Sequence, residues 1–286
     1  YFFFFFNFPY FRKNNKNMKN TILFVVVLFL SIHKKTMGFS AVIAAPKQQV
    51  QQQQVQQVEQ QTCVYTPSAW TEMVDDLKRR AVASCQPGRT TFIALAGAPG
   101  SGKSTLAEAI VEKLNAEEEI AVVLPMDGYH IPRRELKHMG SRGLKYGEDR
   151  YDPTKECTTY ADLLARRGSP WTFDPKLLYQ DFSQAKANGY ANLPTYSRVK
   201  SDPVPGGVQL CKHHRIAICE GNYLLSHDDD DWKPLQSLWD EMWFLYIPQE
   251  EVIMERLIGR HLVTWNDEKT ELWGAPGREG AKRKAM

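Results

Sequence analysis

The feature that most constrains this chain is the eight-residue stretch GAPGSGKS at Gly97–Ser104. It fits the pattern G-x-x-x-x-G-K-[ST] in full, and it joins a short apolar run over 91–97 to a segment of helical periodicity over 103–115. Glycines let the backbone curl around an anion, and the N–H groups that begin a helix stabilise negative charge. The stretch therefore predicts a phosphate-binding loop between a buried strand and a helix.

The residue types of this loop suit a nucleotide. Lys103 is expected to reach the β- and γ-phosphates, and Ser104 or Thr105 offers a hydroxyl to Mg²⁺. A glycine-rich turn without a ligand is the alternative. The predicted nucleotide-binding residues are Gly97, Ala98, Pro99, Gly100, Ser101, Gly102, Lys103, Ser104 and Thr105.

Apolar runs and helical periods alternate along the rest of the chain. Buried strands are predicted at 91–97, 120–125, 215–220 and 242–247, and helices at 67–86, 103–115 and 248–262. This alternation indicates an α/β fold with a parallel sheet flanked by helices. The interval 128–210 is rich in Tyr, Pro, Gly and Arg, with one helix-like piece at 160–166, so we expect an insertion over the sheet edge.

Composition and charge narrow the classes of protein. Of the 286 residues, 43% are hydrophobic and 24% are charged, which supports a sizeable core and excludes a disordered chain, a collagen or a disulfide scaffold. Residues 1–60 hold seven Lys or Arg and one Glu, so residues 61–286 hold 29 basic and 32 acidic residues. A mildly acidic body argues against a protein that follows nucleic-acid phosphates by charge.

The cysteines favour reduced thiols. Their number is odd, and no C-x-x-C occurs among Cys63, Cys85, Cys157, Cys211 and Cys219. Cys211 and Cys219 flank two histidines, His213 and His214, but the spacing of a four-ligand zinc site is missing.

The N-terminal part divides into three segments before a folded domain at 63–286. Residues 1–17 resemble translated upstream sequence, residues 18–47 have the basic, apolar and small-residue parts of a targeting leader, and residues 48–62 form a Gln-rich linker. The apolar run TILFVVVLFLSI is shorter than the ~20 residues of a membrane-spanning helix, and a single anchor is the alternative. The following GFSAVIAAP resembles a plastid leader of algae with secondary plastids, so we expect a plastid protein; a cytoplasmic protein is the alternative.

Asp127 follows the second predicted strand directly. A carboxylate at the carboxyl end of a parallel strand points into the ligand crevice. Because the phosphate loop ends the preceding strand, we expect the two strands to be neighbours, with Asp127 able to take a proton from a substrate hydroxyl. An ordinary Asp-Gly turn is the alternative.

Six motifs in order resemble one known family. The series GAPGSGKST, MDGYHIPRREL, RRGSPWTFDP, LPTYSRVKSDPV, ICEGNYLL and ERLIGRHL, within about residues 70–265, is similar to the phosphoribulokinase/uridine kinase family of P-loop kinases. The similarity is greatest to the uridine-kinase-like, fructose-transport-system-kinase-like branch. It implies a P-loop NTPase fold with an acceptor-binding insertion and a helical lid.

The resemblance also implies roles for single residues. Asp127 would be the catalytic base beside Lys103, and Glu220 would hold the Mg²⁺ shell or orient the substrate, with a helix cap as its alternative. Arg256 and Arg260 would be lid arginines that close on the phosphates, with a solvated basic face as their alternative. Candidates for the acceptor pocket are Tyr129, His130, Arg150, Tyr196 and Arg198.

Two further segments complete the comparison with the family. The segment Trp171–Pro175 resembles a family signature, and we expect a packed loop there. Past WGAPGREGAKRKA, relatives continue into an Asn-rich segment and a last strand and helix, which this sequence does not show. We expect either a truncated C-terminus or a rebuilt one, which puts the adenine contacts in doubt.

The expected function is ATP- and Mg²⁺-dependent phosphoryl transfer to a hydroxyl of a small molecule, such as a nucleoside, a sugar, glycerate or a pantothenate-like compound. Positioning and charge neutralisation would supply most of the catalysis. The alternative is a nucleotide-binding regulator without acceptor kinase activity. The expected partners are ATP and the acceptor, with no nucleic acid, and the sequence leaves the oligomeric state open.

Overall fold

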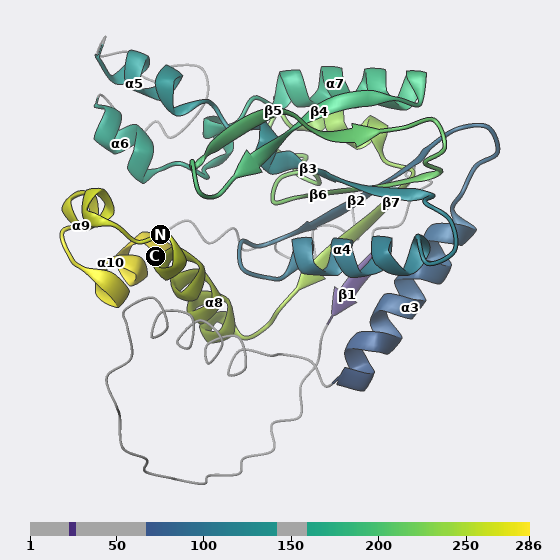
Figure 1. Cartoon of the computed structure of the whole chain (residues 1–286), viewed down its shortest axis with the longest axis horizontal. Helices are drawn as coiled ribbons and strands as arrows, with labels where there is room; N and C mark the ends of the chain where they lie inside the picture. Colours follow the sequence, from purple (N-terminus) through teal and green to yellow (C-terminus); the bar gives the residue numbers. More distant parts are fainter. Residues whose placement is uncertain (1–22, 27–66, 142–158) are drawn as a thin grey trace, which may run out of the picture.

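A parallel five-stranded sheet forms the centre of the molecule (Figure 1). The computed structural model describes residues 23–26, 67–141 and 159–286. The strand order is β1-β7-β2-β6-β3, with β1 at Leu23–Val26, β7 at Glu241–Tyr246, β2 at Thr91–Gly97, β6 at Ile216–Gly221 and β3 at Ala121–Pro125. The α/β class with a parallel sheet is confirmed, and the four predicted strands lie within one residue of their expected bounds.

The sheet is buried on both faces, which explains why its strands are continuous apolar runs. Every residue of β2 and β6 is buried. The helices α3 (Pro67–Ala83) and α4 (Lys103–Leu114) cover one face, with Leu77 and Ile110 packed on Ile93 and Trp243. The helical period predicted for both segments is thus confirmed as a core-facing stripe.

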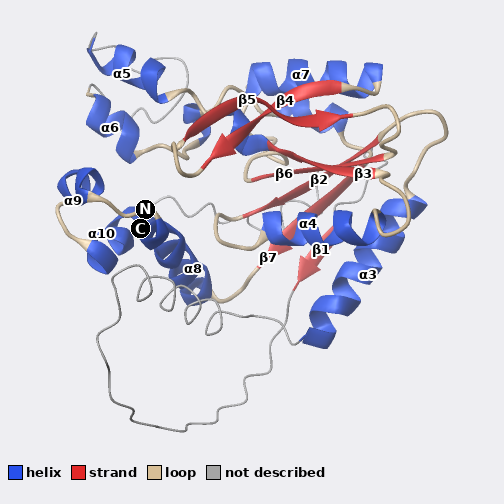
Figure 2. Ribbon diagram, in the orientation of Figure 1, coloured by secondary structure: helices blue, strands red, loops and turns tan. Residues whose placement is uncertain are grey.

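The insertion covers the opposite face of the sheet and not only its edge (Figure 2). Its helix α7 (Pro175–Asn188) and its antiparallel hairpin of β4 (Ala191–Ser197) and β5 (Asp202–Leu210) pack on that face. Phe182, Leu193 and Leu210 share a core with the sheet residue Phe92. The remaining elements are η1 (Met126–Tyr129), α5 (Arg133–Ser141), α6 (Tyr160–Ala165), η2 (Pro170–Thr172) and, after the insertion, η3 (Lys233–Leu238).

Three helices follow the last core strand. They are α8 (Glu250–Val263), α9 (Asp267–Trp273) and α10 (Gly277–Ala285). In Figure 1, α9 and α10 lie beside α8, and an ion pair of 2.6 Å between Arg278 of α10 and Glu255 of α8 fastens them. The stretch WGAPGREGAKRKA is therefore folded against the predicted lid helix.

The strand order corrects one expectation. The strands β2 and β3 are not neighbours, because β6 lies between them, with Leu95 of β2 and Pro125 of β3 both in register with Glu220. Local periodicity cannot reveal such an order. Its consequence is that Glu220 stands between the phosphate loop and Asp127 at the carboxyl end of the sheet.

The N-terminal predictions lie almost wholly outside the described residues. The exception is β1, which falls within the predicted leader and pairs in parallel with β7, Leu23 opposite Trp243. Among the described residues, no helix combines the length and the apolar character needed to cross a membrane. The predicted upstream segment and the Gln-rich linker are outside the described part of the chain.

Candidate active site

The predicted phosphate loop joins β2 to α4 with the backbone that anion binding requires. Gly100 and Gly102 have φ values of 80° and 95°, in the left-handed region that favours glycine. A Cβ on Gly100 would lie 3.0 Å from the carbonyl oxygen of Ile253, so the loop also packs closely on α8. No side chain caps the start of α4, which leaves its first N–H groups available to bind an anion.

Lys103 places a buried cation at this loop. Its side chain is 7% exposed, and its Nζ donates to the carbonyl oxygen of Ala98 at 3.1 Å and to Oδ1 of Asn222 at 2.7 Å. Burial lowers the pKa of Lys103, while the carboxylates of Glu220 and Asp127 act in the opposite direction. A buried ammonium group held by neutral oxygens is suited to phosphate oxygens, which are stronger partners.

Glu220 ends β6 within reach of the loop. It is buried, and burial raises its pKa, whereas Lys103 and a hydrogen bond from the Ser104 side chain lower it. The hydroxyl of Ser104 and the carboxylate of Glu220 are oxygen ligands of the kind that Mg²⁺ prefers. The donor chemistry of this pair fits the metal that the fold family uses.

Asp127 lies in η1 and is the second residue after the end of β3 at Pro125. The charge of its carboxylate raises the pKa of Lys103, of Arg260 and of His130. Asp127 is therefore close enough to the phosphate loop, the lid helix and the insertion to act on all three. The Asp-Gly pair is not an ordinary turn. A Cβ on Gly128 would lie 2.2 Å from the carbonyl oxygen of Pro194, so glycine is what allows β4 to approach η1.

Two of the five acceptor candidates, His130 and Tyr196, meet near Asp127, and the exposed Arg198 acts on the same site through its charge. The ring of His130 lies 3.9 Å from that of Phe173 and 4.9 Å from that of Tyr196, measured between centroids. Arg198 follows β4 and lowers the pKa of Lys103 and of Arg260 by its charge. The insertion thus brings His130, Tyr196 and Arg198 to the carboxyl end of the sheet.

Of the other two candidates, the structure places Tyr129 elsewhere. Tyr129 is 2% exposed and points into the core, where its hydroxyl donates to Asp181 at 3.1 Å and its ring meets Phe182 edge to face. Arg150 lies outside the described residues. The segment Trp171–Pro175 is packed as expected, and its Phe173 forms one wall of the His130 site.

Both predicted lid arginines face the loop from α8. Nη1 of Arg256 donates to the carbonyl oxygens of Gly100 at 3.4 Å and Ser101 at 3.3 Å. Arg260 is one helical turn further along the same face, and its charge acts on Lys103. The alternative of a wholly solvated basic face does not describe Arg256, whose guanidinium bonds the loop. Arg260 is exposed to solvent, and its lid role stays a prediction.

Two candidate functional residues, Asn222 and Arg167, are not among those predicted from the sequence. Asn222 holds Lys103, and Arg167 pairs with Asp202 at 3.0 Å while its guanidinium lies 5.8 Å above the Tyr196 ring. Both stand inside quoted motifs, ICEGNYLL and RRGSPWTFDP. Asn222 had a detectable signal, since it lies two residues past the acidic end of a core strand.

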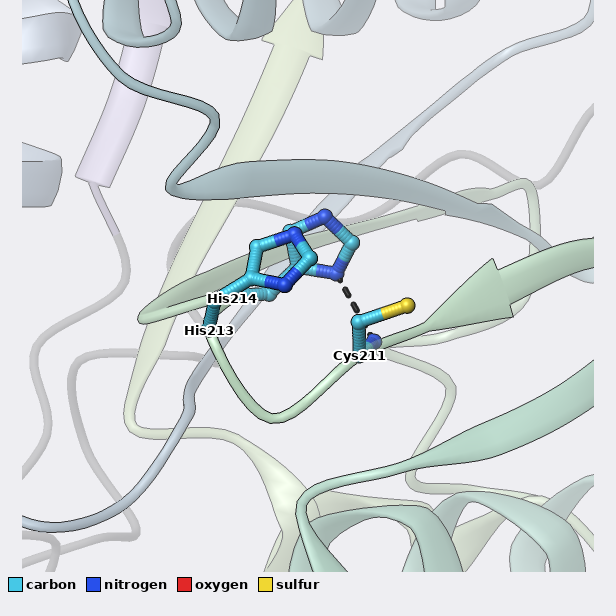
Figure 3. A group of neighbouring side chains, drawn as sticks. All are labelled: Cys211, His213 and His214. Atoms are coloured by element: carbon cyan, nitrogen blue, oxygen red, sulfur yellow. Dashed lines mark hydrogen bonds between the residues drawn. The ribbon is translucent and has the colours of Figure 1, made fainter.

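A second cluster of possible metal ligands lies at the opposite end of the sheet. Cys211, His213 and His214 bring their ligand atoms within 4.8 Å of one another just before β6 begins (Figure 3). Cys219 is not part of it, being buried within β6. Nδ1 of His214 accepts a hydrogen bond from the Cys211 N–H at 2.9 Å, and its Nε2 lies 3.4 Å from Glu119. These two contacts explain His214 as a structural residue that links neighbouring segments.

The fold and site together define a P-loop kinase, and comparison with known proteins agrees. A "putative uridine kinase" of Schizosaccharomyces pombe is 34% identical over 195 residues, which span 66% of this chain and 74% of that protein. The "ATP-dependent kinase YFH7" of Zygosaccharomyces rouxii is 27% identical over 157 residues, 51% of this chain and 41% of the yeast protein. No family model matches the chain.

Solved structures give the same assignment. The crystal structure of a "putative fructose transport system kinase" from Silicibacter sp. TM1040 superposes with a TM-score of 0.55 at 28% identity, over 74% of this chain and 93% of that one. The chain belongs to the uridine-kinase-like family of P-loop kinases. The resemblance seen in the six motifs is thereby confirmed, and ATP use follows from the kinase relatives.

Proposed function

We propose that this protein transfers the γ-phosphoryl group of ATP to a hydroxyl of a small molecule, with Asp127 as the base. The observation that carries the proposal is the meeting of Lys103, Glu220 and Asp127 at the carboxyl ends of β2, β6 and β3. These groups supply phosphate binding, a metal ligand and a proton acceptor for an attacking hydroxyl.

Each group has a distinct task. The uncapped start of α4 and Lys103 bind the phosphates, and Arg256 and Arg260 add positive charge from the lid side where negative charge develops. Asp127 orients the acceptor hydroxyl and takes its proton. Ser104 and Glu220 would hold Mg²⁺, which when bound neutralises phosphate charge.

The alternative is a nucleotide-binding regulator without acceptor kinase activity. A regulator needs the loop and Lys103, but it has no need of a base or of a pocket for an acceptor. The insertion residues His130, Tyr196 and Arg198, gathered around Asp127, support the kinase over the regulator.

A direct experiment separates the two functions. The full chain with ATP and Mg²⁺ is screened for ADP release against uridine, fructose, D-glycerate and pantothenate. The kinase proposal expects at least one acceptor to stimulate ADP release well above the rate with water alone. Tight ATP binding without stimulation by any acceptor would favour the regulator.

We also propose plastid targeting through residues 18–47, supported by the basic start, the apolar run and the acid-poor GFSAVIAAP stretch. The strand β1 competes with this proposal, because a removed leader would take Leu23–Val26 from the sheet edge. A fluorescent fusion of residues 18–62 tests the targeting. Plastid fluorescence is the expected result, and diffuse cytosolic fluorescence would reject it.

A further inference from the structure

Arg167 is a buried cation with unused hydrogen-bond donors. Its side chain is 7% exposed, and its Nη2 donates to Oδ1 of Asp202 at 3.0 Å. Its Nε and Nη1 have no hydrogen-bond partner within the described part of the chain. Buried donors on a charged group are strongly destabilising when unpaired, so a guanidinium left in this state indicates a site that a ligand completes.

A second unpaired polar atom lies beside Arg167. Nδ1 of His130 is buried and also lacks a partner among the described residues. Arg167 and His130 lie against the same Tyr196 ring, 5.8 Å and 4.9 Å from its centroid, and the Arg167 charge lowers the pKa of His130. Unpaired atoms from two separate segments thus lie close together near Asp127, whose charge raises the pKa of His130.

The loop that carries Arg167 is fixed to the phosphate-binding machinery. The hydroxyl of Tyr223 donates to the carbonyl oxygen of Gly168 at 2.7 Å, and Tyr223 follows Asn222, the residue that holds Lys103. The Gly168 N–H donates to Oγ1 of Thr172 at 2.9 Å, which braces the other side of the loop. Arg167 therefore has a set position relative to Lys103, as a residue that positions a substrate requires.

The surroundings of Arg167 are rich in positive charge. On α10, Lys284 has a pKa lowered to about 8 by burial and by the charges of Lys269, Arg260, Arg133 and Arg167. The nearest acid to Arg167, Asp202, is already shared, because its Oδ1 also accepts the Arg133 N–H at 2.9 Å. Arg133 is itself paired with Glu268 at 2.8 Å, but the unpaired donors of Arg167 beside the other cations favour a negative group on the acceptor in addition to the phosphates of ATP.

We propose that Arg167 and His130 form a subsite for an anionic group of the acceptor, a carboxylate or a phosphate. The Nε and Nη1 donors of Arg167 bind this group, and Nδ1 of His130 hydrogen-bonds a neighbouring polar atom of the same molecule. The acceptor hydroxyl then faces Asp127. This inference rests on the proposed kinase function and narrows its acceptor class to anionic compounds over free nucleosides and free sugars.

Binding measurements test the subsite without relying on turnover. Calorimetry uses the full chain saturated with ADP and Mg²⁺ and titrates D-glycerate, pantothenate and ribulose 5-phosphate against uridine and fructose. We expect at least one anionic probe to bind at least tenfold more tightly than both neutral ones. The carboxylate and phosphate probes distinguish the two forms of the anion. Equal or tighter binding of a neutral probe would overturn the proposal, whether or not any variant folds.

Variants then locate the binding at Arg167. Arg167→Gln should weaken binding of the preferred anionic probe about 10- to 100-fold, the effect of losing a charged hydrogen bond, and leave ADP affinity within twofold. Arg79→Gln is the control, an exposed arginine of α3 that pairs with Asp76 on the surface, and should change neither. Unchanged probe affinity in a folded Arg167→Gln protein would overturn the assignment of the subsite to Arg167.

The outcomes also separate this inference from the kinase proposal. Anionic binding that needs Arg167, without phosphoryl transfer, would keep the subsite and reject the kinase. Transfer to uridine or fructose that is unaffected by Arg167→Gln would keep the kinase and reject the subsite.

Discussion

Lys103 is the residue on which phosphate binding most depends. Within the described part of the chain, its buried ammonium is held by two neutral oxygens, so we expect Lys103→Ala to lose about 2–4 kcal/mol of transition-state stabilisation with little effect on folding. Lys113→Ala is a matched control, a lysine of the same helix that pairs with Asp75 on the surface. Steady-state kinetics measures both, and equal activity of the Lys103→Ala enzyme would contradict the loop assignment.

Asp127 is expected to act through its proton affinity and not through its shape. Asp127→Asn should lower turnover by roughly 10²–10⁴-fold, the usual contribution of general base catalysis, with ATP affinity nearly unchanged. Single-turnover kinetics at saturating ATP separates the two quantities. A collapse of ATP binding with normal turnover at saturation would instead make Asp127 a metal ligand or a structural residue.

His130 makes the insertion sensitive to acid. Burial lowers its pKa from 6.5 to about 4, so between these values the unfolded chain binds more protons and stability falls as pH falls. The free energy of unfolding should decrease by about 2 kcal/mol between pH 7 and pH 5 from this residue alone. Urea unfolding of wild type and His130→Gln at both pH values measures it, and an equal pH effect in the two proteins would refute the assignment.

At the scale of elements, Gly128 joins η1 to β4. A Cβ there would meet the Pro194 carbonyl at 2.2 Å, so Gly128→Ala should displace the hairpin and cost about 1–3 kcal/mol of stability. Because the hairpin carries Tyr196 and Arg198, acceptor KM should also rise. Gly189→Ala is the control: a Cβ there meets open space and only its φ of 69° is strained, so it should leave acceptor KM unchanged.

The sequence predicts some elements better than others for a physical reason. A strand buried on both faces must be apolar throughout, so β2, β3, β6 and β7 are visible as runs. The hairpin β4–β5 contains prolines and glycines and its burial does not alternate, so neither an apolar run nor a period of two marks it in the sequence. The helix α7 does carry a local start signal, Asp174 as N-cap followed by Pro175.

The residues of the candidate site also differ in how well the sequence predicts them. The loop, Glu220 and Asp127 depend on local motifs at strand ends, where parallel topology already fixes what they face. Arg167 and the strand order depend on which segments pack together. Tyr129 also depends on packing, because its neighbour His130, and not Tyr129 itself, faces the acceptor side. Such pairings are set by tertiary packing and have no local signature.

At the scale of the whole molecule, the lid and the insertion meet over the sheet. Arg133 of α5 pairs with Glu268 of α9 at 2.8 Å, and Arg260 of α8 shares its electrostatic surroundings with Arg198 of the hairpin. The phosphates are therefore approached from the lid and the acceptor from the insertion, with Asp127 between. If the proposed function holds, this arrangement would direct the phosphoryl group to an acceptor and not to water.

The central claim is tested most directly by following the phosphoryl group itself. The full chain is incubated with Mg²⁺ and ATP labelled in its γ-phosphate, with each acceptor of the screen in turn, and the products are separated. We predict label on a hydroxyl of one acceptor in equal amount to the ADP formed, and its loss in the Asp127→Asn enzyme. Label that stays in ATP, or appears only as inorganic phosphate with every acceptor, would contradict the account.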